Sequence, residues 1–323
     1  MQLSIIIPAY NCSETLKTAV SSVVGYDDTE IIIVDDGSTD STENVIDELK
    51  NKYINIICRK QTNSGPASAR NTGIMLAKGK YIMFLDSDDS FEQGAIDIIL
   101  SAVTNDIDML IFGFKQRFYG RADDKIYSLD SPFSVDEFYK NNLLNQVWNK
   151  AYKKSFITDN GICFSDYRYG EDRIFNANIL CANPVVKSIP DVLYNYNIDK
   201  SVSLISGFIP EKFEACKTIH SYYSKLCESN VSNYMFMKNI LSCMTVLFAD
   251  NCKLTRKQKK LKIKEIVSDR IVISSMNEKQ QGFANEIVRK IIKSSNVNLN
   301  YIFAYSVSIC QKYMLPLFLK FRK

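Results

Sequence analysis

Carboxylates follow two apolar runs in this chain, at the points where chemistry could occur. The run at residues 81–85 leads into Asp86 and Asp88, and the run at residues 31–34 leads into two more aspartates. Acids one residue apart are spaced to share one divalent cation, because such cations prefer oxygen ligands. A bound cation would in turn hold a diphosphate group. Aspartates at a strand end also serve as turn residues or helix caps, so either run alone leaves both interpretations open.

The elements that must position these acids are predicted to be buried strands. Unbroken apolar runs of this length are typical of strands covered on both faces, and helical patterns separate them along the chain. Such alternation predicts an α/β fold, a mostly parallel, doubly wound sheet with helices on both faces. Parallel strands end at one edge of the sheet, and ligands of open α/β sheets bind at that edge. We therefore expect the acids of both runs to form one site.

Net charge divides the chain into two regions. Residues 1–204 carry 20 Lys+Arg against 28 Asp+Glu, a net charge of −8, whereas residues 205–323 carry 20 against 8, a net charge of +12. We interpret 1–204 as the catalytic domain and 205–323 as a helical C-terminal region. An acidic domain that binds an anionic ligand needs a cation or focused basic groups. The basic region suits peripheral contact with a membrane or a homo-oligomer interface, although basic runs such as residues 255–264 are also typical of a solvated helix face.

Several classes of function lack their sequence signals. The nine cysteines are scattered without a Cys-x-x-Cys pair, which argues against a disulfide framework or a zinc site and favours the cytoplasm. The amino-terminal run is too short for a signal peptide or a membrane span. Neither a P-loop nor a Gly-x-Gly-x-x-Gly motif follows the first predicted strand, which counts against P-loop enzymes and dinucleotide dehydrogenases. We also expect no nucleic-acid partner.

Six motifs resemble family 2 inverting glycosyltransferases with a glycosyltransferase A-type fold, of the kind that builds bacterial surface polysaccharides. The motifs occur in the order and spacing of that family over roughly residues 3–200. They are Ser4–Asn11, Val34–Asp40, Asn63–Gly73, Phe84–Asp89, Trp148–Lys150 and Gly170–Asp172. Residues 196–203 lack the histidine that many members place there as a metal or phosphate contact. The resemblance thus leaves a third metal ligand unidentified.

This resemblance implies a role for individual residues. The residues that would contact the nucleotide are Pro8, Ala9, Tyr10, Asp36, Asn63, Arg70, Asp86 and Ser87. Asp88, together with Asp86, would bind Mn²⁺ or Mg²⁺. Asp172 would be the general base, with Glu171 and Trp148 on the acceptor side. Each also has an ordinary structural interpretation: Glu171 and Asp172 suit the first turn of any helix, Arg70 could simply pair with acids, and Trp148 could be a wall or core residue.

The expected function is metal-assisted, inverting sugar transfer. A nucleotide-sugar donor, expected to be UDP-linked, would give its sugar to a hydroxyl of a growing cell-surface glycan or a lipid-linked glycan. The enzyme would work in the cytoplasm or at the inner face of the cell membrane. Two alternatives remain open, namely a nucleotide-sugar-binding subunit without catalysis and a metal-dependent nucleotidyltransferase.

Overall fold

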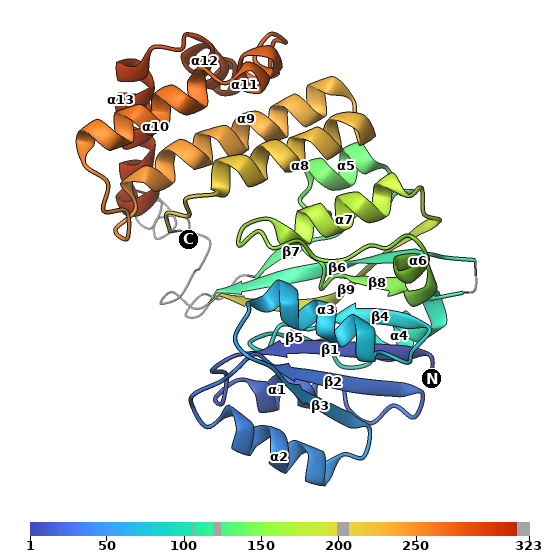
Figure 1. The fold of residues 1–323 in the computed structure, drawn as a ribbon. Helices are drawn as coiled ribbons and strands as arrows, with labels where there is room; N and C mark the ends of the chain where they lie inside the picture. The colour runs from blue at the N-terminus through green and yellow to red at the C-terminus, as the bar shows by residue number, and fades with distance from the viewer. Residues whose placement is uncertain (105, 119–123, 199–206, 315–323) are drawn as a thin grey trace. The chain divides into compact units, whose positions relative to one another are not determined.

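The computed structural model describes residues 1–104, 106–118, 124–198 and 207–314 (Figure 1). The chain divides into two compact units. Unit 1 comprises Met1–Asp166 and Glu171–Ser201, and unit 2 comprises Tyr167–Gly170 and Val202–Lys323. The domain boundary expected between residues 204 and 205 lies outside the described residues.

Unit 1 alternates strands and helices through most of its length. Its strands are β1 (Leu3–Ala9), β2 (Thr29–Asp35), β3 (Ile56–Lys60), β4 (Tyr81–Phe84), β5 (Ser90–Phe91), β6 (Met109–Phe118), β7 (Lys125–Tyr127), β8 (Lys150–Lys153) and β9 (Val186–Ile198). Its helices are α1 (Leu16–Ser21), α2 (Thr42–Lys52), α3 (Pro66–Leu76), α4 (Ala95–Ala102), α5 (Val135–Lys140), α6 (Lys154–Asp159) and α7 (Glu171–Cys181).

All of these strands belong to one sheet, in the order β3-β2-β1-β4-β8-β6-β9-β5, with β7 beside β6. Strands β3, β2, β1 and β4 pair in parallel, and β9 pairs in parallel with β6. Strand β8 runs antiparallel between β4 and β6, so that β6 points the same way as β4. Within the described residues, six of the nine strands therefore share one direction, with β5, β7 and β8 opposed. The mostly parallel sheet expected from the sequence is confirmed.

The central strands bring their carboxyl ends to one edge of the sheet. Strand β1 lies between β2 and β4, with Ala9 opposite Asp35 and Ile6 opposite Phe84. The chain adds β2 and β3 on one side of β1 and then returns to place β4 on the other side. This reversal of strand order is the switch point at which open α/β sheets bind ligands.

A glycine lets α3 lie against β1. A Cβ atom at Gly73 would come within 2.3 Å of the Ile6 side chain, so a larger residue would push the helix outward. Arg70 lies three residues earlier, on the same face of the helix. The close approach therefore brings the Arg70 side chain to the edge where β4 ends.

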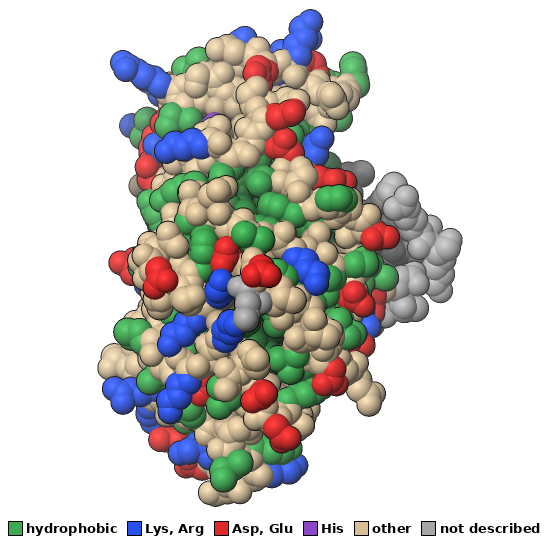
Figure 2. Space-filling model, turned by 90° about the vertical axis from the view of Figure 1, so that its right-hand side faces the viewer, with side chains coloured by type: hydrophobic (Ala, Val, Ile, Leu, Met, Phe, Trp, Pro, Cys, Tyr) green, Lys and Arg blue, Asp and Glu red, His purple; other side chains and the backbone are tan. Residues whose placement is uncertain are grey.

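Unit 2 is helical within its described part, as expected from the sequence. Its helices are α8 (Lys212–Leu226), α9 (Ser229–Thr245), η2 (Val246–Phe248), α10 (Arg256–Val267), α11 (Arg270–Ser275), α12 (Phe283–Lys293), α13 (Val297–Ile309) and η3 (Cys310–Met314). Helix α9 packs against α8, α10, α11 and α13. It contributes Phe236, Ile240 and Met244 to the hydrophobic core of unit 2. None of the described helices is both long and apolar enough to cross a membrane. Acidic and basic side chains are interspersed over the face in Figure 2, without a continuous area of one sign.

Candidate active site

Asp36 organises the loop that follows β3. Its Oδ1 accepts hydrogen bonds from Gln61 Nε2 (2.8 Å) and the backbone N–H of Ser64 (2.9 Å), and its Oδ2 accepts one from the backbone N–H of Gly65 (2.8 Å). Three donors on one buried carboxylate fix the loop against the end of β2. This loop carries Asn63, whose side chain is exposed. Asp36 and Asn63 thus lie at the same edge of the sheet, and their nucleotide contacts stay a prediction.

The loop after β1 is tied to the same place. The Ala9 carbonyl accepts a hydrogen bond from the backbone N–H of Asp36 (2.8 Å), and the Asn11 N–H donates to Ser38 Oγ (3.0 Å). Pro8 and Ala9 are largely covered, whereas Tyr10 is half exposed at the rim. Of these three residues, which the resemblance places at the nucleotide, Tyr10 has the most exposed side chain.

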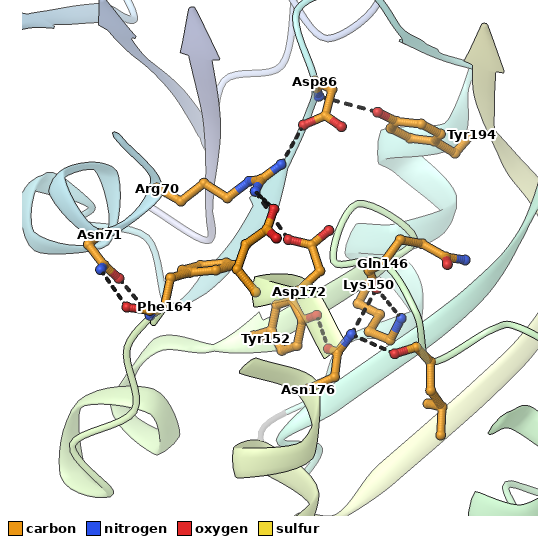
Figure 3. A network of polar contacts seen from close by, with 12 residues as sticks. Arg70, Asn71, Asp86, Gln146, Lys150, Tyr152, Phe164, Asp172, Asn176 and Tyr194 are labelled. Carbon is orange, nitrogen blue, oxygen red and sulfur yellow. Dashed lines mark hydrogen bonds and ion pairs between the residues drawn. The ribbon is translucent and has the colours of Figure 1, made fainter. Parts of the chain in front are cut away.

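Arg70 joins the acids of two distant segments. Its Nη2 lies 2.8 Å from Asp86 Oδ1, and its Nη1 lies 3.1 Å from Asp172 Oδ1 and 3.6 Å from Glu171 Oε1 (Figure 3). The guanidinium also lies over the ring of Phe164, 5.5 Å from its centroid. Burial opposes the charge, but the three carboxylates outweigh it and raise the pKa of Arg70 above its usual range.

Asp172 is a carboxylate whose protonation is balanced near neutrality. Burial is the largest cause and raises its pKa to about 7, with the charges of Glu171 and Asp86 acting in the same direction. Arg70, and then Lys150, oppose this shift. A carboxylate with a pKa near the working pH is suited to exchange protons. The first turn of α7 therefore presents a group that can act as a general base.

The acidic loop after β4 contains both exposed and buried carboxylates. Asp88 is exposed, while Asp89 is buried and accepts hydrogen bonds from the Tyr194 hydroxyl (2.8 Å) and the Asn197 N–H (2.7 Å). The Tyr194 hydroxyl also accepts a bond from the Asp86 N–H (3.2 Å), which pins the loop from both sides. Desolvation, and after it repulsion from Asp86, raises the pKa of Asp88.

The carboxylates of this loop fit a divalent cation whose remaining positions are filled by oxygens of a bound phosphate group and by water. Asp86 and Asp88 supply carboxylate oxygens that repel one another, and a cation would relieve that repulsion. Within the described residues there is no cluster of three or more His, Cys, Asp or Glu side chains arranged to hold a metal. Two carboxylates completed by phosphate oxygens and water are the usual environment of Mg²⁺. Ser87, between the two aspartates, is partly buried.

Trp148 lies in the wall behind the acidic loop. Its side chain is only 6% exposed, and its ring stacks on Tyr194 with centroids 4.3 Å apart and on Tyr196 at 5.4 Å. Phe114 meets the same indole edge-on. The structure thus places Trp148 in a wall of aromatic side chains with little of its surface exposed, and its acceptor-side contact stays a prediction. Glu171, by contrast, does lie beside Asp172 and Arg70.

A buried polar network secures the loop between Leu143 and Asn149. The Lys150 ammonium is fully buried and donates to the carbonyls of Leu143 and Gln146 and to Asn149 Oδ1, at 2.6–2.7 Å. Figure 3 shows Lys150 beside Gln146. Burial lowers the pKa of Lys150 well below its usual range, but three acceptors match the three N–H groups of an ammonium. From α7, Asn176 donates to the carbonyls of Leu144 and Gln146. The network thereby links this loop to the helix that carries Asp172.

Replacing Asn176 with leucine is expected to destabilise unit 1 by about 3 kcal/mol. The change removes two donated bonds and the bond accepted from the Tyr152 hydroxyl (2.6 Å) inside a site without solvent. Urea unfolding followed by circular dichroism measures the effect. Asn178→Leu is the matched control, because Asn178 lies on the same helix, is partly exposed and has no side-chain hydrogen bond among the described residues. Equal free energies of unfolding for the two variants would contradict the stabilisation of the Leu143–Asn149 loop by Asn176.

Sequence reasoning did not identify four of these residues. Asp89 had the same local signal as Asp86 and Asp88, yet it is a buried anchor. Lys150 belongs to the motif Trp148–Lys150, which does not mark it as a buried cation, and Tyr194 and Asn176 carry no signal of their own. Lys150 is a charged residue directly before the apolar pair Ala151 and Tyr152, and that position is the clue that could have marked it.

The family model for "Glycosyl transferase family 2" matches residues 4–174, a segment that contains Asp36, Asp86, Asp88 and Asp172. Among curated proteins, the poly(ribitol-phosphate) beta-glucosyltransferase of Bacillus spizizenii is 30% identical over 218 residues, 65% of this chain and 34% of the relative. The Escherichia coli UDP-Glc:alpha-D-GlcNAc-diphosphoundecaprenol beta-1,3-glucosyltransferase WfaP is 49% identical over 90 residues, 27% of this chain and 35% of the relative. The chain thus spans about a third of the length of these relatives.

A solved structure shares the fold across both units. Residues 1–349 of S. aureus TarS in complex with UDP-GlcNAc superpose with a TM-score of 0.70, covering 97% of this chain and 92% of that chain. The sequence identity is 17%, so this likeness concerns the fold. It confirms the glycosyltransferase A-type architecture expected from the sequence.

Proposed function

This chain belongs to glycosyl transferase family 2 and is a glycosyltransferase, and on that basis we propose that it transfers a sugar from a UDP-linked donor to a hydroxyl of a growing cell-surface glycan. The relatives named above act on ribitol-phosphate polymer and on a diphosphoundecaprenol-linked sugar, and both kinds of acceptor present hydroxyl groups. The observation that carries the proposal is the Arg70 bridge, which unites the acidic loop after β4 with the first turn of α7.

In the proposed reaction, the acceptor hydroxyl oxygen attacks the anomeric carbon as the bond from that carbon to the diphosphate breaks. Asp172 takes the hydroxyl proton, and the nucleoside diphosphate leaves with the bonding electrons. One displacement inverts the anomeric configuration. Arg70 holds Asp172 in position and provides positive charge beside the acidic loop, where the diphosphate would lie.

Asp86 and Asp88 would hold Mn²⁺ or Mg²⁺ together with the diphosphate oxygens. The cation would supply positive charge that stabilises the departing nucleoside diphosphate. Tyr10, Asp36 and Asn63 would lie along the nucleoside, and Glu171 would face the acceptor. Pro8, Ala9 and Ser87 would contribute mainly backbone and loop shape, since their side chains are small or largely covered.

A screen of nucleotides for protection against thermal unfolding tests the donor assignment. We expect UDP and UDP-sugars to raise the melting temperature in the presence of Mn²⁺, and GDP, CDP and ADP to have little effect, because binding to the folded state stabilises it by mass action. Release of UDP from a bound UDP-sugar with an added glycan acceptor then reports transfer. Binding without UDP release under any acceptor would favour a non-catalytic subunit. Pyrophosphate formed from a nucleoside triphosphate and a sugar phosphate would identify a nucleotidyltransferase.

A further inference from the structure

Helix α13 carries an apolar stripe on its outer side. Leu299, Ile302, Tyr305 and Ile309 are 44%, 62%, 49% and 37% exposed, and their spacing of three, three and four residues places them on one face. The opposite face packs into unit 2 through Ala304. The solvent side of a surface helix is normally polar, so a helix that is apolar on both sides indicates a further contact.

Helix α10 adds positive charge beside this stripe. The Lys260 ammonium donates to Asn298 Oδ1 at the start of α13 (2.7 Å), and Arg256 and Lys260 both lie over the Tyr301 ring. The two helices also lie side by side in Figure 1. Six of the twelve residues of α10 are Lys or Arg against the single acid Glu265. Among the described residues, Lys262 is the one cation of this helix that has an acidic partner.

The exposed side of α10 shows the same mixture of charge and apolar surface. Lys257, Leu261 and Lys264 are exposed and lie four and then three residues apart, on the face that contains Lys260. Leu261 is 57% exposed. Together, Lys257, Leu261 and Lys264 of α10 and Leu299, Ile302 and Ile309 of α13 form what we call the α10–α13 surface.

We propose that the α10–α13 surface docks on an anionic lipid bilayer. Apolar side chains can enter the boundary between head groups and acyl chains, while flanking lysines remain at the level of the phosphates. Charge complementarity selects this occupant, because cations that have no acidic partner among the described residues surround an apolar stripe and match anionic head groups, whereas a second copy of this surface would bring like charges together. The sequence continues past the described residues with Leu315–Lys323, which has a similar apolar and basic composition. The proposal rests on unit 2 alone and does not depend on the donor or acceptor.

Sedimentation of the full chain with vesicles tests this proposal. We expect binding to vesicles that contain phosphatidylglycerol, weak binding to phosphatidylcholine alone, and loss of binding as salt is raised. The double variant Lys257→Gln/Lys264→Gln should bind about 25-fold less, at roughly fivefold for each cation near an anionic surface. Ile302→Ser/Ile309→Ser should weaken binding by about tenfold or more.

Matched controls come from unit 1. Lys50→Gln/Lys52→Gln on α2 removes the same charge, and Ile54→Ser removes an isoleucine that is fully exposed, so both should bind vesicles as the unaltered chain does. UDP release with a soluble acceptor, measured in parallel, reports the proposed function separately from docking. It should be unchanged in both α10–α13 variants.

Three outcomes would overturn the proposal. The first is failure of the unaltered chain to bind phosphatidylglycerol vesicles at low salt. The second is a dimer in light scattering that Ile302→Ser/Ile309→Ser dissociates while vesicle binding persists, since the stripe would then face a second copy. The third is complete loss of binding on deletion of residues 315–323 while both double variants bind normally, which would assign docking to that segment instead.

Discussion

Replacing Asp172 with asparagine is expected to lower turnover by about 10²–10⁴-fold while donor binding is retained. The amide has nearly the same shape and can still accept a hydrogen bond from Arg70, but it cannot take a proton from the acceptor. Steady-state UDP release gives the rate, and thermal protection by UDP gives donor binding. Asp97→Asn is the matched control, because Asp97 is an exposed acid in the first turn of α4 and faces no site residue. An unchanged rate in Asp172→Asn would remove this residue from the mechanism.

The same carboxylate predicts how the rate depends on pH. The charged groups that act on Asp172 come from three other places in the fold, Arg70 on α3, Asp86 after β4 and Lys150 on β8, and from Glu171 on its own helix. With a pKa of about 7, Asp172 is protonated below neutrality and cannot serve as a base. Turnover should therefore rise with pH through about 7 and fall roughly tenfold for each unit below about 6. A rate that is flat from pH 5 to pH 8 would contradict this assignment.

The local sequence was sufficient to predict the site residues that come shortly after a strand, such as Asp36 and Asp86. The apolar runs before Asp36 and Asp86 have the length and composition of buried strands, and once parallel pairing was assumed, their carboxyl ends had to share an edge. Arg70 could be placed on α3, but not its partners, because the bond to Asp172 joins residues 102 positions apart. The acids that the Arg70 side chain can reach depend on how closely α3 packs against β1. Gly73 permits that close packing, but its contact with Ile6 can be recognised only in the folded chain.

Irregular strands limited the prediction of the rest of the sheet. Strand β9 runs from Val186 to Ile198 and contains Pro190 in its interior, although a proline in a sequence usually indicates the first residue of a strand or an edge position. Its pairing with β6 shifts register between the pairs Ile111–Ser188 and Gly113–Val192, so Pro190 lies within an irregularity where no ladder hydrogen bond is needed. The two-residue strand β5 is too short to leave any periodicity. Both elements position Tyr194, which is why its bond to Asp89 was not foreseen.

Replacing Asp88 with asparagine is expected to lower metal-stimulated turnover by about 10²-fold or more without loss of the fold. Asp88 is the exposed acid of the loop, and its side chain makes no hydrogen bond or ion pair with another residue within the part of the chain that the structure describes, so its replacement should leave the fold intact. It removes one of two carboxylates proposed to hold the cation, and the electrostatic stabilisation that a cation gives to a leaving diphosphate is worth several kcal/mol. Thermal protection by Mn²⁺ and UDP added together, compared with UDP alone, measures cation binding directly.

The contrast between Asp88 and Asp89 makes this experiment specific. Asp89→Asn alters the buried acceptor of the Tyr194 hydroxyl and the Asn197 N–H, so it should lower the melting temperature even without ligands. Asp88→Asn should leave that temperature unchanged and abolish only the additional protection by Mn²⁺. Asp159→Asn, at an exposed position at the end of α6, controls for loss of one negative charge from unit 1. Full turnover by Asp88→Asn with chelator present would contradict this prediction, because sugar transfer would then proceed without a cation bound at Asp88.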